Sequence, residues 1–475
     1  MKNRKIIYLL SIIAMFAAGC TMAPQYSRPD APVPSEWPNG PAYQETKTNS
    51  SAPAAVELPW REFIPDEKLR KVIDTALNNN RDFRLAALNV ERARAYYGIQ
   101  RAELFPSVSG VGSMYKERTP ADLSSSGSPY TAERYDVNLG IASWEIDFFG
   151  RIRSLKDKAL EQYLATELAR RSAQLMMISS TAQIYLSLAA DKEVLQLVTS
   201  TLTTQESLYN LIKKRADAGV ASELDLRRAQ TQVDIARGDV ALYTQLVAQD
   251  ENALNLLAGS PVSKELLPAD LKSVIPPREI SAGLLSDVLL SRPDVMAAEH
   301  QLKAANAHIG AARAAFFPRI ALTASAGTAS ADLSGLFKSG SGTWMFSPQI
   351  VMPIFDARTW SAYEVTKIEK EISIAEYEKA IQTAFREVAD ALAERGTVIQ
   401  RLAAQQSLVD ALAVTYRLSE SRYNKGIDSY LSVLDAQRSL YGAEKGLIML
   451  RFAQTSNLIT LYKTLGGGEN KQTDK

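Results

Sequence analysis

Two segments of this chain are diverged copies of each other, and this duplication constrains the fold more than any other feature of the sequence. Ser291 to Ile320 aligns with Asn80 to Val108 at an offset of 212 residues. Each copy is an Ala- and Arg-rich helical pattern that stops at a Phe-Pro pair and continues into alternating Ser/Gly/Ala-rich sequence. A period of this length is too long for a solenoid, so we expect two halves of one duplicated body.

Each copy leads into a hairpin of strands, at about residues 106–144 and 318–354. In the first hairpin, Tyr135, Val137, Leu139 and Ile141 alternate with Asp136, Asn138, Gly140 and Ala142. In the second, Ile320, Leu322, Ala324 and Ala326 alternate with Ala321, Thr323, Ser325 and Gly327. This period of two predicts strands, and about ten residues is the length that a tilted strand needs to cross a bilayer.

Very long helices are predicted after each hairpin. Arg151 to Ala218 contains no proline or glycine, and Ala357 to Lys425 contains only Gly396. At about 1.5 Å per residue, such a helix reaches roughly 100 Å. Gly219 and Gly426 mark tight turns into returning helices.

The returning helices carry matching apolar stripes. Leu226, Ala229, Val233, Ala236, Val240 and Tyr243 correspond to Val433, Ala436, Leu440, Ala443, Leu447 and Leu450. Spacings of three and four residues are typical of a coiled-coil seam. The stripes alone would suit an ordinary helical bundle, but a globular bundle has no need of membrane-length hairpins.

Charge and residue counts exclude several classes of function. The chain has 54 Lys and Arg against 53 Asp and Glu, a balance that argues against a nucleic-acid partner. Its two histidines, His300 and His308, lie eight residues apart, which is not the spacing of a helical zinc pair. No nucleophile-elbow or phosphate-loop motif lies near them. We therefore expect wall residues there, with no catalytic residue, no metal site and no cofactor, and an enzyme is the weaker alternative.

The N-terminus is typical of an exported protein. Three basic residues precede a nearly apolar run from Ile6 to Ala18, and Cys20 follows where cleavage is expected. This pattern resembles a bacterial lipoprotein signal, in which Cys20 is lipidated and becomes the new N-terminus. A plain secretory signal cut near Ala18 is the alternative. No later stretch reaches about 18 consecutive apolar residues, so any membrane crossing after Cys20 must be made by strands.

These patterns divide the chain into five expected parts. They are a signal peptide (1–19), a lipid-anchored, Pro-rich extended segment (20–60), a first repeat (61–275), a second repeat (276–468) and a polar C-terminal tail (469–475). The Pro-rich segment carries eight prolines between Ala23 and Pro59, a composition typical of an extended tether that forms no core.

Four membrane strands cannot close, and an open sheet edge in lipid leaves backbone groups unsatisfied. Two chains would give eight strands and a barrel filled by side chains, whereas three would give twelve strands and a pore. Small and polar strand positions suit the wet interior of the larger barrel: Ser109, Ser113, Asn138, Thr323 and Ser325. The expected fold class is an α+β membrane channel. It is a homotrimer whose 12-stranded transmembrane β-barrel, with four strands per chain, continues into a long α-helical coiled-coil barrel.

Several motifs in combination carry a resemblance. They are the lipoprotein signal that ends at Cys20 (the lipobox), the pair RAELFPSV and RAAFFPRI, and the motifs WEIDFFGRIRSLKDKALEQYLAT, GVASELDLRRAQ and YNKGIDSYLSVLDAQRSLY. Together they resemble the TolC family of outer-membrane efflux channels, in particular its OprM-type lipoproteins. The resemblance implies a trimer with a twelve-stranded barrel and a periplasmic helical tunnel. It also implies two partners, a periplasmic membrane-fusion adaptor and an inner-membrane proton-driven pump of the RND class, with which the trimer expels drugs and other toxic compounds.

The resemblance further implies where the channel closes. The tips Arg215 to Arg228 and Arg422 to Arg438 are the places where the long helices turn back. In the family, charged and tyrosine residues at these turns close the tube. Gly219 and Gly426 are then the turn positions and adaptor contacts.

Three side chains match the family's gate residue by residue. Tyr423 matches the second tip, Asp435 an entrance aspartate and Asp225 a first-tip acid. The chain departs from the family's pattern at Ser432, where a further aspartate can occur, and at Asp428, where a linking arginine can occur. Three copies of Asp435 around one axis would repel one another and attract cations. The alternative is that Asp225 and Asp435 are solvated tip residues with no role in closing the channel.

Two other functions remain as alternatives. A periplasmic adaptor or scaffold also combines a lipobox with coiled coils, but it would not need four membrane-length strands. A channel for secreted protein or for metal ions keeps the architecture and changes the cargo, and no methionine-rich or histidine-rich track marks metal export. We therefore expect small-molecule efflux, in the outer membrane and in contact with its lipid.

Overall fold

The computed structural model describes residues 21–43, 53–281 and 286–467. The strands are β1 (Val108–Thr119), β2 (Tyr130–Ile146), β3 (Arg319–Ser330) and β4 (Gly342–Val351). The helices are α2 (Trp60–Phe63), α3 (Glu67–Asn79), α4 (Arg81–Ala102), α5 (Arg151–Asp217), α6 (Glu223–Ala258), α7 (Pro293–Ala314), α8 (Ala357–Asn424) and α9 (Tyr430–Thr464). Short 3-10 turns are η2 (Ala55–Glu57), η3 (Lys264–Leu266), η4 (Leu271–Ser273), η5 (Ser286–Ser291) and η6 (Leu333–Gly335).

The chain divides into two compact units. The first comprises Met1–Asp30, Asn89–Glu167 and Ala297–Tyr377, and it holds the sheet with the adjoining ends of four helices. The second comprises Ala31–Leu88, Leu168–Met296 and Glu378–Lys475, and it holds the helical turns and the remaining helices.

The two duplicated segments have the structure that the sequence predicts. Helices α4 and α7 are 22 residues long each, and each ends four residues before its proline, Pro106 or Pro318. The helices stop there because proline has no N–H to donate to the carbonyl four residues earlier, which belongs to Ala102 or Ala314. Strands β1 and β3 follow directly, so a helix does lead into a strand twice.

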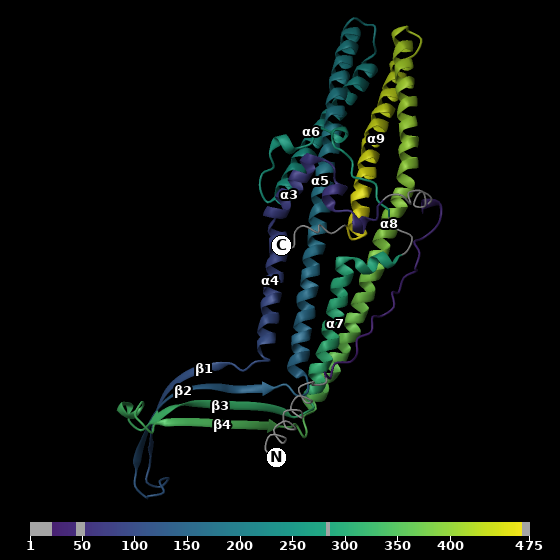
Figure 1. Cartoon of the computed structure of the whole chain (residues 1–475). Coiled ribbons are helices and arrows are strands. Elements are labelled where there is room, and N and C mark those ends of the chain that lie inside the picture. Colours follow the sequence, from purple (N-terminus) through teal and green to yellow (C-terminus); the bar gives the residue numbers. More distant parts are fainter. Residues whose placement is uncertain (1–20, 44–52, 282–285, 468–475) are drawn as a thin grey trace. The chain divides into compact units, whose positions relative to one another are not determined.

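The four strands form one antiparallel sheet in the order β1-β2-β3-β4, and Figure 1 shows them side by side. The two predicted apolar rows lie on the same face, because Leu139 pairs with Ala326 and Ile141 with Ala324. The opposite face carries the predicted polar positions, which are Ser109, Ser113, Asn138, Thr323 and Ser325. The sheet therefore has an apolar face and a face with small and polar side chains.

A β-bulge in β2 changes which side chains belong to each face. The register of β2 against β3 shifts between Ile141 and Trp144, and Ser143 has φ 52°. The Ser143 N–H donates to Thr323 Oγ1 at 3.2 Å. Because one residue is added, Trp144 joins the apolar face and Glu145 the polar face, the reverse of what the upstream alternation would give.

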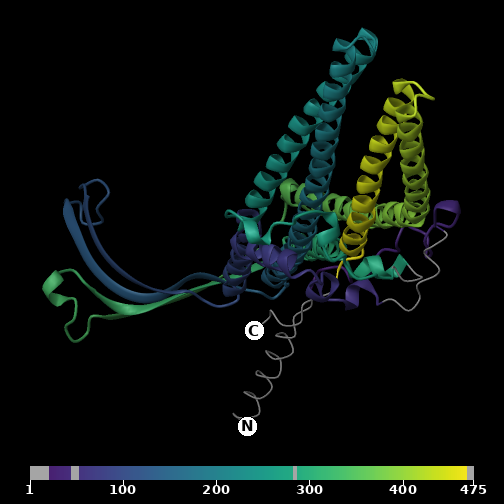
Figure 2. The same cartoon turned by 90° about the horizontal axis from the view of Figure 1, so that it is seen from above.

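The long helices are unbroken and return as antiparallel pairs. Helix α5 has 67 residues and α8 has 68, and Figure 2 shows α5 with α6 in teal and α8 with α9 in yellow-green. The predicted stripes are buried at most positions: Ala229, Val233, Ala236 and Tyr243 on α6, and Val433, Ala436, Ala443 and Leu447 on α9. One buried cluster joins Val194 and Val198 of α5 to Tyr243 and to Ile448 of α9. Within the described ranges, no helix is both long enough and apolar enough to cross a membrane.

The described part of the Pro-rich segment has little regular secondary structure and is fastened to helices, and Leu58 at its end is buried. In the first unit, Arg28 donates to Glu299 at 3.1 and 2.7 Å, and the Tyr26 hydroxyl donates to the same carboxylate at 3.1 Å. In the second unit, Trp37 stacks on Phe385 with ring centroids 5.3 Å apart. Composition predicted a tether but not these contacts, which depend on side chains far away in sequence.

Candidate functional site: the helix tips and the strand-helix junction

The first helix tip turns at Gly219. Its φ of 75° is a left-handed conformation that glycine adopts without strain, and the Val220 N–H returns to the Arg215 carbonyl at 2.8 Å. Ser222 then caps α6, because its hydroxyl oxygen accepts from the Asp225 N–H at 3.1 Å. The Ser222 hydroxyl donates to Asp225 Oδ2 at 2.7 Å. Asp225 is thus part of the helix cap.

The second helix tip turns at Gly426, with φ 72°. Here an ion pair closes the turn: Arg422 donates to the two carboxylate oxygens of Asp428 at 2.6 and 2.9 Å. This hydrogen bond lowers the pKa of Asp428 below its usual range, so the carboxylate stays charged. Sequence reasoning recorded Asp428 only as a departure from the family's pattern, although Arg422 lies six residues before it.

A tyrosine and an arginine connect the two tips. Arg215 of the first tip donates to the Tyr423 hydroxyl of the second at 2.8 Å, and its guanidinium carbon lies 5.4 Å from the centre of the Tyr423 ring. Tyr423 also contacts Tyr430, with ring centroids 5.5 Å apart. Burial first, then the neighbouring Tyr423, raises the pKa of Tyr430. Beneath them, an apolar cluster joins Ile212 of α5 to Val433 of α9.

The structure separates the three predicted gate residues. Tyr423 lies in the link between the tips, and Asp225 lies close enough to Tyr430 for its charge to contribute to the raised pKa of that tyrosine. Asp435 lies apart from them on α9, where it pairs with Arg438 at 2.8 Å and its side chain is 65% exposed. Asp435 and Arg438 line a cavity of about 190 Å³ between α6 and α9. Sequence reasoning missed Arg215 and Tyr430, which only a contact across the two repeats identifies.

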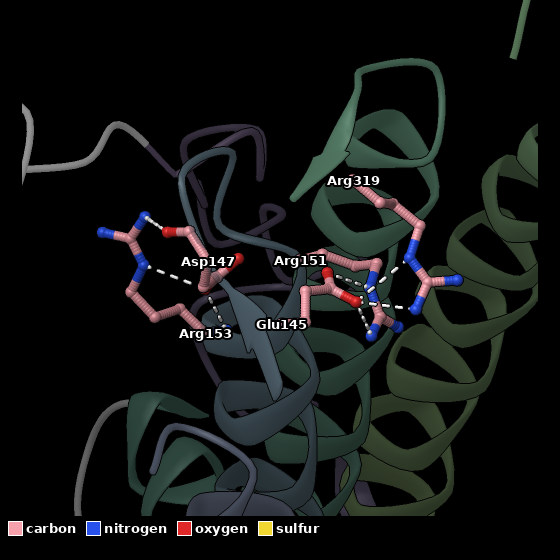
Figure 3. Close-up of polar contacts among 5 residues, drawn as sticks. All are labelled: Glu145, Asp147, Arg151, Arg153 and Arg319. Atoms are coloured by element: carbon pink, nitrogen blue, oxygen red, sulfur yellow. Dashed lines mark hydrogen bonds and ion pairs between the residues drawn. The ribbon is translucent and has the colours of Figure 1, made fainter. Parts of the chain in front are cut away.

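A second polar site lies in the first unit, where β2 becomes α5. Glu145 accepts from Arg151 at 2.8 and 2.9 Å and from Arg319, the first residue of β3, at 2.7 Å (Figure 3). Asp147 accepts from the backbone N–H and the Nε of Arg153 at 2.9 and 3.1 Å. The carboxylate side chains are only 13% and 8% exposed.

The signal for this junction is present in the sequence. The motif WEIDFFGRIR places an acid six residues before a base twice, at Glu145 and Arg151 and at Asp147 and Arg153. Sequence reasoning used the motif for its resemblance and assigned these residues no role. Arg319 could not be found this way, because it belongs to the other repeat.

Three further residues were singled out from the sequence, namely Cys20, His300 and His308. Cys20 lies outside the described residues. His300 contacts Glu161 of α5 at 2.5 Å, and His308 contacts Glu369 of α8 at 3.0 Å. Both histidines therefore connect α7 to neighbouring helices of the first unit.

The chain is helix-rich and carries one four-stranded sheet with an apolar and a polar face, as one protomer of a trimeric outer-membrane channel would. Comparison with known proteins specifies the class further. The model of the family described as outer membrane efflux protein matches residues 72–260 and 284–467. The chain therefore belongs to this family, the TolC-type outer-membrane efflux channels.

Individual relatives match over nearly the whole chain. The toluene efflux pump outer membrane protein TtgC and the antibiotic efflux pump outer membrane protein ArpC, both of Pseudomonas putida, are each 48% identical, and each match covers 99% of this chain and 97% of the relative. The open-state crystal structure of the Neisseria gonorrhoeae MtrE outer membrane channel has a TM-score of 0.85 and 38% identity, covering 94% of this chain and 98% of that chain. The protein is thus the outer-membrane component of an efflux pump.

Proposed function

We propose that this protein is the exit duct of a tripartite multidrug efflux pump and that its two helix tips are the gate. Three copies close their sheets into one barrel, and the duct conducts drugs and other small toxic compounds passively. An inner-membrane RND pump and a periplasmic membrane-fusion adaptor supply the cargo, the adaptor docking at the tips around Gly219 and Gly426. Cys20 carries the lipid anchor.

The observation that carries the gate is the contact between the tips. The hydrogen bond from Arg215 to Tyr423 at 2.8 Å joins the α5–α6 turn to the α8–α9 turn. Arg215 and Tyr423 are half-buried, and polar contacts that water can reach contribute little net stability. Such a link holds two turns together at rest and can be exchanged for contacts with a partner protein. Asp225 supports the first turn from the cap, while Asp435 supplies the negative charge that selects cations.

Relatives bear on the cargo. Two are named for toluene efflux and for antibiotic efflux. Both names describe small organic molecules, and we extend that substrate class to this chain. The sheet's face with small and polar residues supports a wet passage, because a polar face suits the water-filled interior of a barrel.

Single-channel recording in planar bilayers tests the gate. Tyr423→Phe keeps the ring and removes the hydroxyl that accepts from Arg215, so it should raise the closed-state conductance. Asp435→Ala should lower the preference for cations and leave the closed state intact. Thr244→Ala, an exposed position further along α6 and away from the tips, is the control. Wild-type leak in Tyr423→Phe and wild-type selectivity in Asp435→Ala would together exclude this gate.

A cellular assay tests the cargo and the partners. Deleting the gene should sensitise cells to antibiotics and to toluene. Crosslinking in cells should capture an adaptor at Val220→Cys or Ile427→Cys, exposed positions that directly follow Gly219 and Gly426. Unchanged susceptibility to every compound, with the protein abundant in the outer membrane, would argue against drug efflux.

A further inference from the structure

A cavity of about 130 Å³ lies within the second unit, between α5, α6 and α9. Val198 of α5 and Ala236 of α6, both buried, form part of an apolar wall. Ile235 also lines the cavity and is 52% exposed, so a small molecule can reach the cavity from the surface of α6. An engineered apolar cavity of about 150 Å³ binds benzene, so a cavity of this size has room for a short organic molecule.

Two buried glutamines in the lining each have an unused hydrogen-bond acceptor. Gln205 of α5 is 5% exposed, and Gln437 of α9 is 8% exposed. The side-chain carbonyl oxygen of each is buried and has no hydrogen-bond partner among the described residues. A buried acceptor without a partner costs free energy, and in native proteins such a group normally has a protein, water or ion partner. Two of them beside one cavity indicate an occupant that donates hydrogen bonds.

Asp239 of α6 adds a negative charge to the same lining. Its Oδ2 accepts from the Tyr441 hydroxyl of α9 at 2.5 Å, and no cationic side chain of the described part of the chain pairs with it. Burial first, and then the hydrogen bond to Asp239, raise the pKa of Tyr441, so this hydroxyl stays neutral. Arg438 also lines the cavity, but it donates to Asp435 at 2.8 Å. The Asp239 carboxylate can therefore accept further hydrogen bonds from a cation.

The lining matches the chemistry of a protonated primary amine. An ammonium group has three N–H donors and one positive charge, and the cavity offers two amide oxygens and a carboxylate as acceptors. The apolar wall suits a short hydrocarbon chain. An anion would be repelled by Asp239, and a pure hydrocarbon would leave both amide oxygens without a donor. Water could donate to these oxygens, but it would leave the carboxylate without a cation.

We propose that this cavity binds a small organic cation, a protonated primary amine with a short apolar chain. The ammonium group donates to Gln205, Asp239 and Gln437, and the chain lies against the apolar wall. The amine contacts α5 and α6 of the first repeat and α9 of the second, so its binding stabilises the packing of the two repeats against each other. The site is independent of the proposed gate, because none of the three side chains takes part in the link between the tips.

Calorimetric titration of the purified trimer with n-butylammonium tests the site at pH 7, where this probe is protonated. The probe is so small that its Kd should lie between about micromolar and millimolar. Butanoate, with the opposite charge, and 1-butanol, with no charge, should bind at least about tenfold more weakly, because hydrogen bonds between charged groups are the stronger ones. No binding of butylammonium would mean that the cavity holds water only and would overturn the proposal. Equal affinity for butylammonium and 1-butanol would overturn it too.

Three variants test whether the amine lies in the cavity. Asp239→Asn keeps an acceptor for Tyr441 and removes the charge, so it should weaken butylammonium binding about tenfold or more. Asp234→Asn is the matched control on the same helix, because its side chain is 58% exposed and it does not line the cavity. Gln205→Leu removes one amide acceptor at similar volume and should also weaken binding. The heat-denaturation midpoint of the unliganded Gln205→Leu trimer should not fall, which shows that the fold is retained.

The outcomes are distinct from those that test the gate. Equal affinity of wild type, Asp239→Asn and Gln205→Leu would place the amine elsewhere and overturn the proposal, and so would equal weakening by Asp234→Asn. Either result would leave the gate untouched, because channel recordings test the gate separately. Butylammonium should raise the heat-denaturation midpoint of wild type more than that of Asp239→Asn, since a ligand of the folded state stabilises it. Equal shifts in the two proteins would contradict the site independently of calorimetry.

Discussion

The chain passes from a strand into a long helix twice, from β2 to α5 and from β4 to α8. The two junctions are stabilised by different contacts. At the first, Glu145 and Asp147 are largely buried and bind three arginines within the same chain. At the second, Asp356 pairs with Arg358, whose side chain is 92% exposed. The neighbouring Ile354 and Phe355 are almost fully exposed as well.

Their places in the sheet explain the difference. The β2–α5 junction is internal, with β3 of the same chain beside it, so Arg319 can complete its contacts. The β4–α8 junction lies at the sheet edge, where a single chain has no neighbour to offer. The duplication produced two similar junctions. The first makes its contacts with a neighbouring strand of the same chain, whereas the second lies at an edge where only another molecule could be its neighbour.

The largest effect is expected at Glu145, the centre of the first junction. Glu145→Ala removes the hydrogen bonds from two arginines to a largely buried carboxylate, which should destabilise the protomer by about 2–3 kcal/mol. Glu145→Gln keeps the shape and should recover part of the loss. Heat denaturation of the purified trimer measures both. Equal stability of Glu145→Ala and wild type would mean that the buried pairs do not hold this junction.

Exchanging the residues that precede α5 and α8 should have an effect of intermediate size. It should destabilise the protein at the first junction and leave the second unchanged. Gly150, with φ 74°, immediately precedes α5, and Asp356 immediately precedes α8 but is not among the described residues with positive φ. Gly150→Asp should destabilise the protein by about 1 kcal/mol, because an L side chain is strained in the left-handed region. Asp356→Gly should leave the heat-denaturation midpoint unchanged. Equal shifts from the two swaps would remove the asymmetry between the junctions.

Ser143 tests whether the bulge holds Glu145 on the polar face. Ser143 has φ 52°, so Ser143→Val should cost about 1–2 kcal/mol, since a β-branched residue fits that conformation badly. Ser143→Gly should be tolerated. The double variant Ser143→Val with Glu145→Ala should lose less than the sum of the two single losses, because both act on the same contacts. If heat denaturation shows that the two stability losses simply add, the bulge and the ionic contacts of Glu145 act independently.

The smallest effect is expected at the second junction's ion pair. The hydrogen bonds from Arg358 lower the pKa of Asp356 below its usual range, so this carboxylate stays charged at any pH near neutrality. A folded-state pKa below the unfolded value gives stability above the unfolded pKa that is lost only as the pH falls through the folded pKa. Because Arg358 is 92% exposed, water screens the pair, and Asp356→Ala should leave the heat-denaturation midpoint unchanged at pH 7 and at pH 5. A clear loss at pH 7 would show that a neighbouring copy buries the pair.

Much of the architecture could be predicted from the chain's periodicities. Alternation over Tyr135 to Ile141 predicted a strand with one apolar face, and the register confirms it. Helix ends before Pro106 and Pro318 followed from the geometry of proline. The tip turns at Gly219 and Gly426 followed from glycine's freedom at positive φ. Each of these features depends on residues close together in sequence.

The candidate sites were less predictable, because their partners are distant in the chain. Tyr423 and Arg215 are 208 positions apart, and Glu145 and Arg319 are 174 apart. A sequence pattern carries no information on which charged residue of one repeat meets which residue of the other. Asp225 and Asp435 were assigned by resemblance, and their roles at the gate stay predictions.

The sequence by itself determined the duplication, the four strands, the long helices and the family, because these depend on local periodicity and on motifs. Only the tertiary structure decided that Ser143 adds a residue to β2, that Glu145 consequently reaches Arg319, and that Ile354 and Phe355 stay uncovered. The physical reason is that a bulge changes the face of every later residue in its strand, and exposure depends on what packs nearby. The two junctions are similar in the repeated sequence. Strand pairing and packing make the first buried and the second exposed.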